Sequence, residues 1–370
     1  MNLSKEPLHL RQTRATFDIP PLTQETREIT LLEEEEKTPQ QERRITRLQE
    51  GYSHIQARHW TVALEIFLDL FEHNTGDEEA LQGMATVFDA LGHYDDLLKA
   101  AQHLLTLDPN SAQALAFQAR ALQKLERLSE ATIANDQALL LDTNLGMAWI
   151  NRSGLQLLQQ RFPEALRSTQ RAIELAPNDT RSWANRGVAL LNFNRLDEAL
   201  EAFDQSLLYD PTSLFALQMK GELLCKMGRM QEVIITTRQL LEINQNNVVA
   251  LTQAAQALRS LELYDSLEEI CGQLIKLTPQ SLFAWEHYMR ALRGLGKFEE
   301  ANLALDQVLE LDPGNVRFIT MKADTLYRLK RYRQAAYSAQ QAISLDNEYP
   351  PAHRIREKAL KLMYQHKDKK

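Results

Sequence analysis

The sequence predicts an all-α fold, a right-handed α-solenoid of nine 34-residue helix–turn–helix repeats followed by a C-terminal capping helix. Three observations predict it. Amphipathic patterns with a period of about 3.6 residues follow one another along most of the chain. The pattern returns every 34 residues. No insertion or deletion interrupts it, since nine such repeats fill residues 44–349 completely.

The stretch from Trp183 to Pro211 shows both helices of one repeat. In the first helix, Trp183, Gly187 and Leu190 recur at spacings of four and three, which places them on one face. After a short polar turn, the apolar positions of the second helix are Leu196, Ala199, Leu200, Phe203 and Leu207. Pro211 ends this helix, because proline disfavours helical backbone at the residue before it.

Residues 1–43 do not join the repeat pattern. They contain four prolines, many threonines and glutamines, and the acidic run Glu33–Glu36. This composition buries too little apolar surface to offset chain entropy, so we expect a disordered acidic arm. Residues 22–37 have a weak helical pattern, with Leu22, Ile29 and Leu32 on one side.

Each repeat from residue 44 onward has the same packing positions. The repeats begin at Arg44, Glu78, Ala112, Gly146, Thr180, Leu214, Val248, Leu282 and Val316. Position 8 is small in every repeat but one, where Met289 stands, so that the two helices can approach closely. Position 17 is aromatic in six repeats and position 20 is alanine in six.

Helix starts are marked by capping residues. The last position of a repeat is Asp, Ser or Asn in seven cases of eight, and Leu145 is the exception. After repeat 9, Pro350 and Pro351 suit a helical first turn, and residues 350–366 are predicted to form the capping helix that a solenoid needs over its last core face. Residues 367–370 form a basic tail.

A large residue at position 4, a small one at 8, an aromatic at 17, alanine at 20 and proline at 32 resemble the tetratricopeptide repeat. The near-consensus repeats resemble bacterial members. The resemblance implies a superhelix that binds a peptide or a partner helix on its concave face. There the first helices contribute positions 2, 5, 9 and 12, flanked by 6 and 13.

Two binding patterns of this family were compared with the sequence. An asparagine ladder requires Asn at position 6 of successive repeats, and only Asn151 and Asn185 match it. The carboxylate clamp of chaperone-tail receptors requires Lys, Asn and Arg at set positions of three repeats. Beside Asn151 the preceding repeat has Ala116 and Arg120 instead, so the clamp is absent.

The inner stripe nevertheless has two chemically different parts. Repeats 4–6 contribute apolar candidates, namely Met147, Ile150, Leu157, Leu158, Val188, Leu191, Phe215 and Met219. Repeats 7–9 contribute Arg259, Arg290, Arg293, Arg317 and Arg328 against Glu286 and Asp324, a balance of +3. The ordinary alternative is that position 12 is half-buried between helices and that the arginines are solvated surface.

Signatures of other function classes are missing from the sequence. There is no Gly-rich phosphate loop, no GxSxG turn and no CxxC pair, and His59 and His93 stand one repeat apart. We therefore expect no catalysis, no cofactor and no metal. The charge of −8 disfavours nucleic acid, and the lack of a long apolar run disfavours membrane insertion.

The sequence thus predicts a cytoplasmic protein-binding scaffold whose partner offers an apolar anchor and an acidic segment. Two alternatives stay open. The chain could be the regulatory subunit of a separate enzyme, or a structural protein that self-associates through its terminal repeats. Cys225 and Cys271 are the only cysteines, and both are expected to be free thiols.

Overall fold

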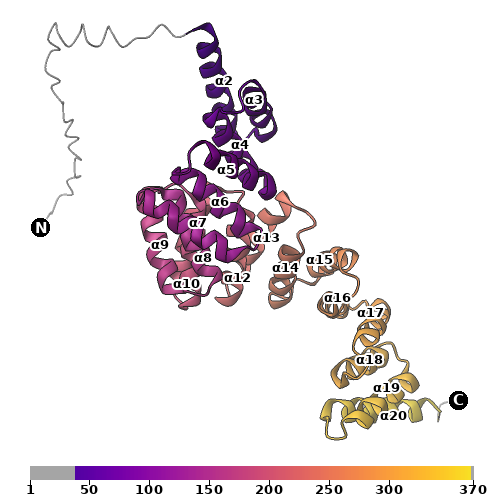
Figure 1. Cartoon of the computed structure of the whole chain (residues 1–370). Coiled ribbons are helices and arrows are strands. Elements are labelled where there is room, and N and C mark those ends of the chain that lie inside the picture. Colours follow the sequence, from indigo (N-terminus) through magenta and orange to yellow (C-terminus); the bar gives the residue numbers. More distant parts are fainter. Residues whose placement is uncertain (1–37, 368–370) are drawn as a thin grey trace, which may run out of the picture. The chain divides into compact units, whose positions relative to one another are not determined.

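The structure is a computed structural model that describes residues 38–367. These residues form nineteen α-helices and no β-strand, which confirms the predicted all-α repeat fold (Figure 1). The predicted arm up to Lys37, its weak helical pattern and the last three residues of the basic tail lie outside the described residues.

The chain divides into two compact units, Met1–Leu107 and Asp108–Lys370. The first contains α2 (Pro39–Gln56), α3 (Trp60–His73), α4 (Glu78–Leu91) and α5 (Tyr94–Leu107). The second contains α6 (Ala112–Lys124), α7 (Leu128–Leu141), α8 (Gly146–Leu158), α9 (Phe162–Leu175), α10 (Thr180–Asn192), α11 (Leu196–Tyr209), α12 (Leu214–Lys226), α13 (Met230–Ile243), α14 (Val248–Ser260), α15 (Tyr264–Leu277), α16 (Leu282–Gly294), α17 (Phe298–Leu311), α18 (Val316–Arg328), α19 (Tyr332–Leu345) and α20 (Pro350–Lys367).

The helices of repeats 2–9 begin at the residues where the sequence places the repeat starts. Their caps follow the prediction as well: seven capping side chains accept a hydrogen bond from a backbone N–H of the first turn, whereas Leu145 cannot. Sequence and local structure agree here because a cap is a short-range interaction.

The first described helix corrects the predicted arm boundary. Helix α2 begins at Pro39, so residues 39–43 are helical. Thr38 caps it in a reciprocal pair, in which its Oγ1 accepts from the N–H of Gln41 at 3.3 Å and its own N–H donates to Gln41 Oε1 at 2.8 Å. At the other end, α20 extends one residue beyond the predicted capping helix, to Lys367.

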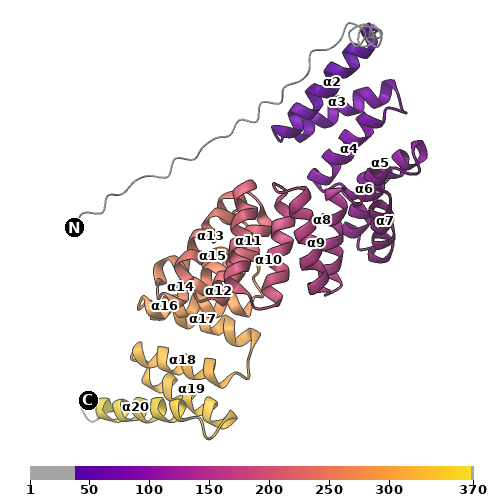
Figure 2. The ribbon, with the colours of Figure 1, turned by 90° about the vertical axis from the view of Figure 1, so that its left-hand side faces the viewer.

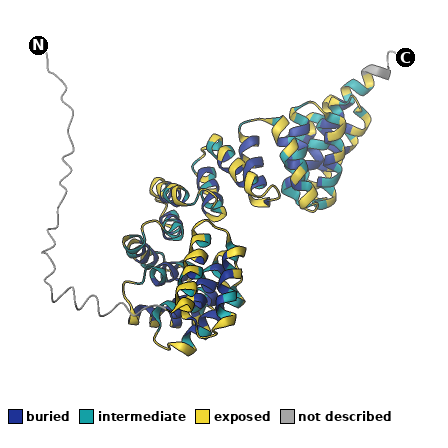
Figure 3. Cartoon of the chain, turned by 90° about the horizontal axis from the view of Figure 1, so that it is seen from above, coloured by how far each residue is buried: buried dark blue, intermediate teal, exposed yellow. Residues whose placement is uncertain are grey.

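The core of each repeat lies where its two helices meet (Figure 3). Position 8 is buried in all nine repeats, and each of the six position-20 alanines is fully buried. In repeats 1 and 5, position 8 faces an aromatic ring at position 24 of the second helix: a Cβ on Gly51 would lie 2.7 Å from Phe67 Cζ. A missing side chain on one helix thus makes room for a ring on the other.

Successive repeats of the second compact unit (Figure 2) pack mainly where the second helix of one repeat meets the first helix of the next, and most first helices also contact each other. Helices α6, α8, α10, α12, α14 and α16 form a series in which each packs against the next, and α18 packs against α20. The second helices of successive repeats make no comparable contacts among the described residues. The first helices thus form one surface of the unit, here called the inner surface, and the second helices form the other, here called the outer surface.

Candidate functional site

The candidate residues of repeats 4–6 lie on the inner surface but differ in accessibility. Leu158 and Phe215 stand exposed, at 56% and 49% of their full area. Residues of a second group are half-buried, namely Met147, Leu157, Val188, Leu191 and Met219. Val188, Leu191 and Met219 also pack against the core around Leu190 and Phe203. Only Leu158 and Phe215 can therefore offer a large apolar area to a partner without loss of core contacts.

Ile150 and Asn151 are buried, at 4% and 2% exposure, and are not accessible to a partner. Asn151 Nδ2 donates to the carbonyl oxygen of Ala116 in the preceding repeat at 2.8 Å. Asn185 Nδ2 likewise reaches Ser153 Oγ at 2.8 Å. The two asparagines that match a ligand-binding ladder in sequence therefore join neighbouring repeats, as buried polar groups require partners.

The same position carries the same bond elsewhere. Gln253 occupies position 6 of repeat 7, and its Nε2 donates to the carbonyl oxygen of Gln218 at 3.1 Å. Gly221 leaves the space for this side chain, because a Cβ there would collide with Gln253 Oε1. Gln253 does not match the asparagine ladder in sequence, yet its shared position with Asn151 and Asn185 was the signal for a bond between repeats.

The arginines of repeats 8 and 9 are organised around two shared carboxylates. Glu286 accepts from Arg290 at 2.8 Å and lies 3.6 Å from Arg317. Asp324 lies 2.6 Å from Arg293 and 3.1 Å from Arg328. Each group holds two guanidinium groups against one carboxylate and keeps one uncompensated positive charge.

The four arginines of these groups are not equivalent. Arg317 and Arg328 keep more than half of their side chains exposed, whereas Arg290 and Arg293 keep about a fifth. Arg293 also donates to the carbonyl oxygen of Met321 at 2.6 Å and to Thr325 Oγ1 at 2.8 Å, so it fixes α18 to α16. Arg317 and Arg328 are the better placed to meet an anionic ligand.

Arg259 in repeat 7 is exposed and contacts a buried imidazole. Its Nη1 donates to His287 Nε2 at 3.4 Å, while His287 Nδ1 donates to the carbonyl oxygen of Phe283 at 2.8 Å. The His287 ring stacks on Phe283 at 3.9 Å between centroids. Burial, assisted by Arg259, lowers the pKa of His287 and favours the neutral ring that this geometry requires.

The described residues contain no group of three or more His, Cys, Asp and Glu placed to hold a metal ion. No helix within residues 38–367 is long and apolar enough to cross a membrane. Both cysteines are free; Cys271 is fully buried and Cys225 is half-buried.

Comparison with known proteins shows a likeness to tetratricopeptide repeats in two parts of the chain. The tetratricopeptide repeat model matches residues 155–212 and 290–350. No curated protein matches the chain. PilF of Pseudomonas aeruginosa is 22% identical with a TM-score of 0.49, over 56% of this chain and 95% of that one. A tetratricopeptide repeat protein of Parabacteroides merdae is 18% identical with a TM-score of 0.43, over 68% of this chain and 99% of that one.

Proposed function

The chain contains tetratricopeptide repeats, and from this premise we propose that it is a non-catalytic protein–protein interaction scaffold or adaptor. A peptide or a partner helix binds across the inner surface of repeats 4–9. Its apolar anchor meets Leu158 and Phe215, and its acidic segment meets Arg259, Arg317 and Arg328.

The exposure of Leu158 and Phe215 carries this proposal. Both lie on first helices, whose inner surface is continuous from α8 to α12. Exposed large apolar side chains on a surface that also holds half-buried ones favour a protein partner. The positive balance of the inner stripe in repeats 7–9 then supplies orientation, because complementary charge steers association more than it raises affinity.

The test is affinity capture of the full chain from its native cells, with quantitative mass spectrometry. Leu158→Asp and Phe215→Asp are compared with Leu140→Asp, a matched control on α7 whose side chain is 84% exposed on the outer surface. We expect recovery of one specific protein to fall roughly tenfold in the first two variants and to stay unchanged in the control. Equal recovery from all three variants would exclude the inner surface.

Two further measurements, enzyme turnover and sedimentation, separate the alternatives. If the captured protein is an enzyme whose turnover changes when this chain is added, the chain is a regulatory subunit. A structural protein that self-associates through its terminal repeats would instead sediment as a concentration-dependent series of oligomers. A single species of about 42.5 kDa in the purified protein would exclude that alternative.

A further inference from the structure

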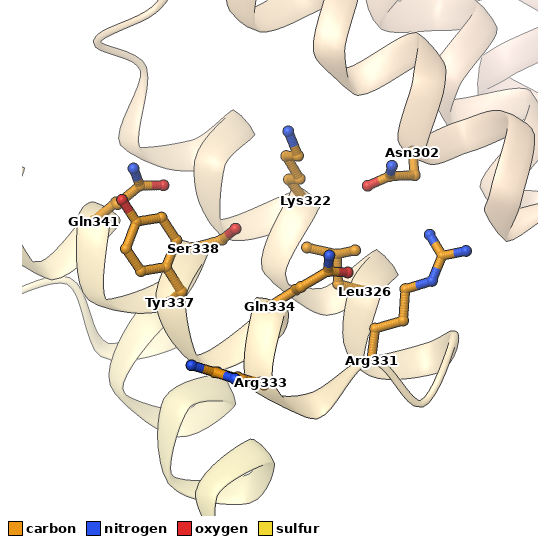
Figure 4. Close-up of a pocket in the computed structure, with 9 residues that line it drawn as sticks. All are labelled: Asn302, Lys322, Leu326, Arg331, Arg333, Gln334, Tyr337, Ser338 and Gln341. Atoms are coloured by element: carbon orange, nitrogen blue, oxygen red, sulfur yellow. The ribbon is translucent and has the colours of Figure 1, made fainter.

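A groove on the outer surface of the second compact unit runs between α17 and α19, with α18 as its floor. Two adjoining cavities form it, of about 780 Å³ and 440 Å³, and both are lined by Lys322 and Gln341. Figure 4 shows the larger one, where Lys322 and Leu326 rise from the floor between Asn302 and Tyr337. We call the two cavities together the outer groove.

The outer groove combines an apolar floor with polar walls. Ile319 and Leu326 contribute buried aliphatic side chains to the floor, at 7% and 4% exposure. On the walls, Tyr337 is 68% exposed, and the side-chain oxygen of Asn302 is shielded from solvent without a hydrogen-bond partner among the described residues. From Gln334 to Leu345, the α19 wall is about 16 Å long at 1.5 Å per residue, enough for a short peptide.

An ion pair found in other repeats is missing at the mouth of this groove. In repeats 3–6 the arginine at position 16, just before the second helix, pairs with a glutamate at position 19 in the first turn, as Arg195 does with Glu198 at 2.5 Å. Repeat 9 has Arg331 at position 16 but Gln334 at position 19. Arg331 reaches across to Glu299 of α17 instead, at 3.0 Å, and so lines the groove.

Position 18 is reversed in charge as well. Four other repeats carry Asp95, Asp197, Asp265 or Glu299 there, where a helix N-terminus favours an anion. Repeat 9 carries the exposed Arg333, which lines the groove mouth beside Arg331. A cation in the first turn of a helix is unfavourable next to the positive end of the helix dipole. The presence of Arg333 is therefore not explained by the stability of α19.

The whole end of the chain shares this charge. Residues 316–370 contain thirteen Lys and Arg and five Asp and Glu, a net charge of +8, although the complete chain carries −8. The first 315 residues therefore carry −16. A third cavity, of about 530 Å³, shares Arg331 and Arg333 with the groove and is also lined by Lys330 and Met363, which continues the basic surface onto α20.

We propose that the outer groove is a second docking site, which binds an acidic peptide segment of a partner protein. One leucine-sized side chain of that segment rests on Leu326 and Ile319. The carboxylates that follow it meet Arg331 and Arg333, and a backbone N–H donates to Asn302. The short groove with its aliphatic floor suits a peptide better than a nucleic acid, whose backbone follows a long basic track and whose bases need aromatic platforms.

The direct test is binding of fluorescein-labelled Gly-Leu-Leu-Glu-Glu-Glu-Glu-Gly to the full chain, followed by fluorescence anisotropy. Gln334→Glu restores the local ion pair of Arg331, so it preserves the fold while it neutralises the mouth. Arg333→Glu reverses the charge there. Gln239→Glu and Arg238→Glu make the same changes at exposed positions of α13 and serve as controls.

We expect both groove variants to raise the Kd of the peptide roughly fivefold or more, with an unchanged melting temperature for Gln334→Glu, and both controls to bind like the parent chain. The same peptide with glutamine in place of glutamate should bind weakly. Equal binding by all four variants, or preferred binding of a twelve-nucleotide single strand, would overturn the proposal. Residues 1–37 contain Leu31–Glu36, which has the sequence of the peptide's centre. If the peptide binds only after residues 1–37 are removed, the acidic segment would belong to this chain, and the proposal of a separate partner protein would be overturned.

Discussion

Gly187 in α10 lies directly against the ring of Phe203 in α11, so that a Cβ on Gly187 would lie 2.6 Å from Phe203 Cε1. Gly187→Ala should therefore lower the free energy of unfolding by about 1–3 kcal/mol, because the ring must move within a close-packed repeat. Chemical denaturation followed by circular dichroism measures the change. Gly272→Ala is the control: a Cβ there contacts nothing within 4 Å, and the variant should gain about 0.5–1 kcal/mol.

Asn151 is predicted to act on stability rather than on binding. Asn151→Ala removes the 2.8 Å bond to the carbonyl oxygen of Ala116, which keeps its helical hydrogen bond, so the loss should cost about 0.5–1.5 kcal/mol. Thermal unfolding checks this, with the exposed Asn192→Ala expected to change stability by less than about 0.5 kcal/mol. Loss of partner binding at temperatures where the variant is fully folded would contradict it.

His287 should make stability depend on pH. Its pKa is lowered in the folded state, so the unfolded chain binds the proton more readily and stability falls as pH drops below the ordinary imidazole value of about 6.5. The contribution of the neutral imidazole to stability is fully present above about pH 6.5, and it is lost as the pH falls to the pKa of His287 in the folded state. His287→Gln, the residue that repeat 7 has at this position, should flatten the pH dependence of the melting temperature between about pH 5 and 7. An unchanged profile would show that the imidazole is not responsible.

The two cysteines should differ in reactivity. Cys271 is fully buried, which raises its pKa to about 12, whereas Cys225 is half-buried. One thiol should react with a disulfide reagent at pH 8 in the native protein and a second only after denaturation. Mass spectrometry of the labelled peptides assigns them. A 225–271 disulfide in native protein would contradict the prediction.

Charge reversal on the inner surface should separate binding kinetics from stability. Arg317→Glu, at an exposed position, should slow partner association and reduce its salt dependence, because exposed charge mainly steers encounter. Arg293→Glu should instead lower the melting temperature, since it places a carboxylate beside the half-buried Asp324 and removes two further hydrogen bonds. Stopped-flow association at two salt concentrations and thermal unfolding distinguish the two effects, and similar behaviour of both variants would contradict the assignment.

The inner surface was predictable only in outline. The resemblance to the tetratricopeptide repeat implies that positions 2, 5, 9 and 12 line the concave face, and the arginine excess is seen when these positions and their flanks are read along repeats 7–9. The period does not say that Leu158 stands exposed while Ile150 is covered, since a neighbouring helix decides which of two inward positions it shields. The outer groove was missed because its signal is a departure from the repeats, namely Gln334 and Arg333 where acids are usual.

The sequence by itself determined the repeat length, the helix starts, the caps and the close approach of the two helices at position 8. These depend on interactions within one repeat, which the local order of residues specifies. Only the tertiary structure decided that Asn151 reaches the preceding repeat, that Glu286 and Asp324 each serve two arginines, and that Arg331 turns into a groove. Those outcomes depend on how repeats stack, because side chains from helices about 34 residues apart compete for the same buried space and the same carboxylates.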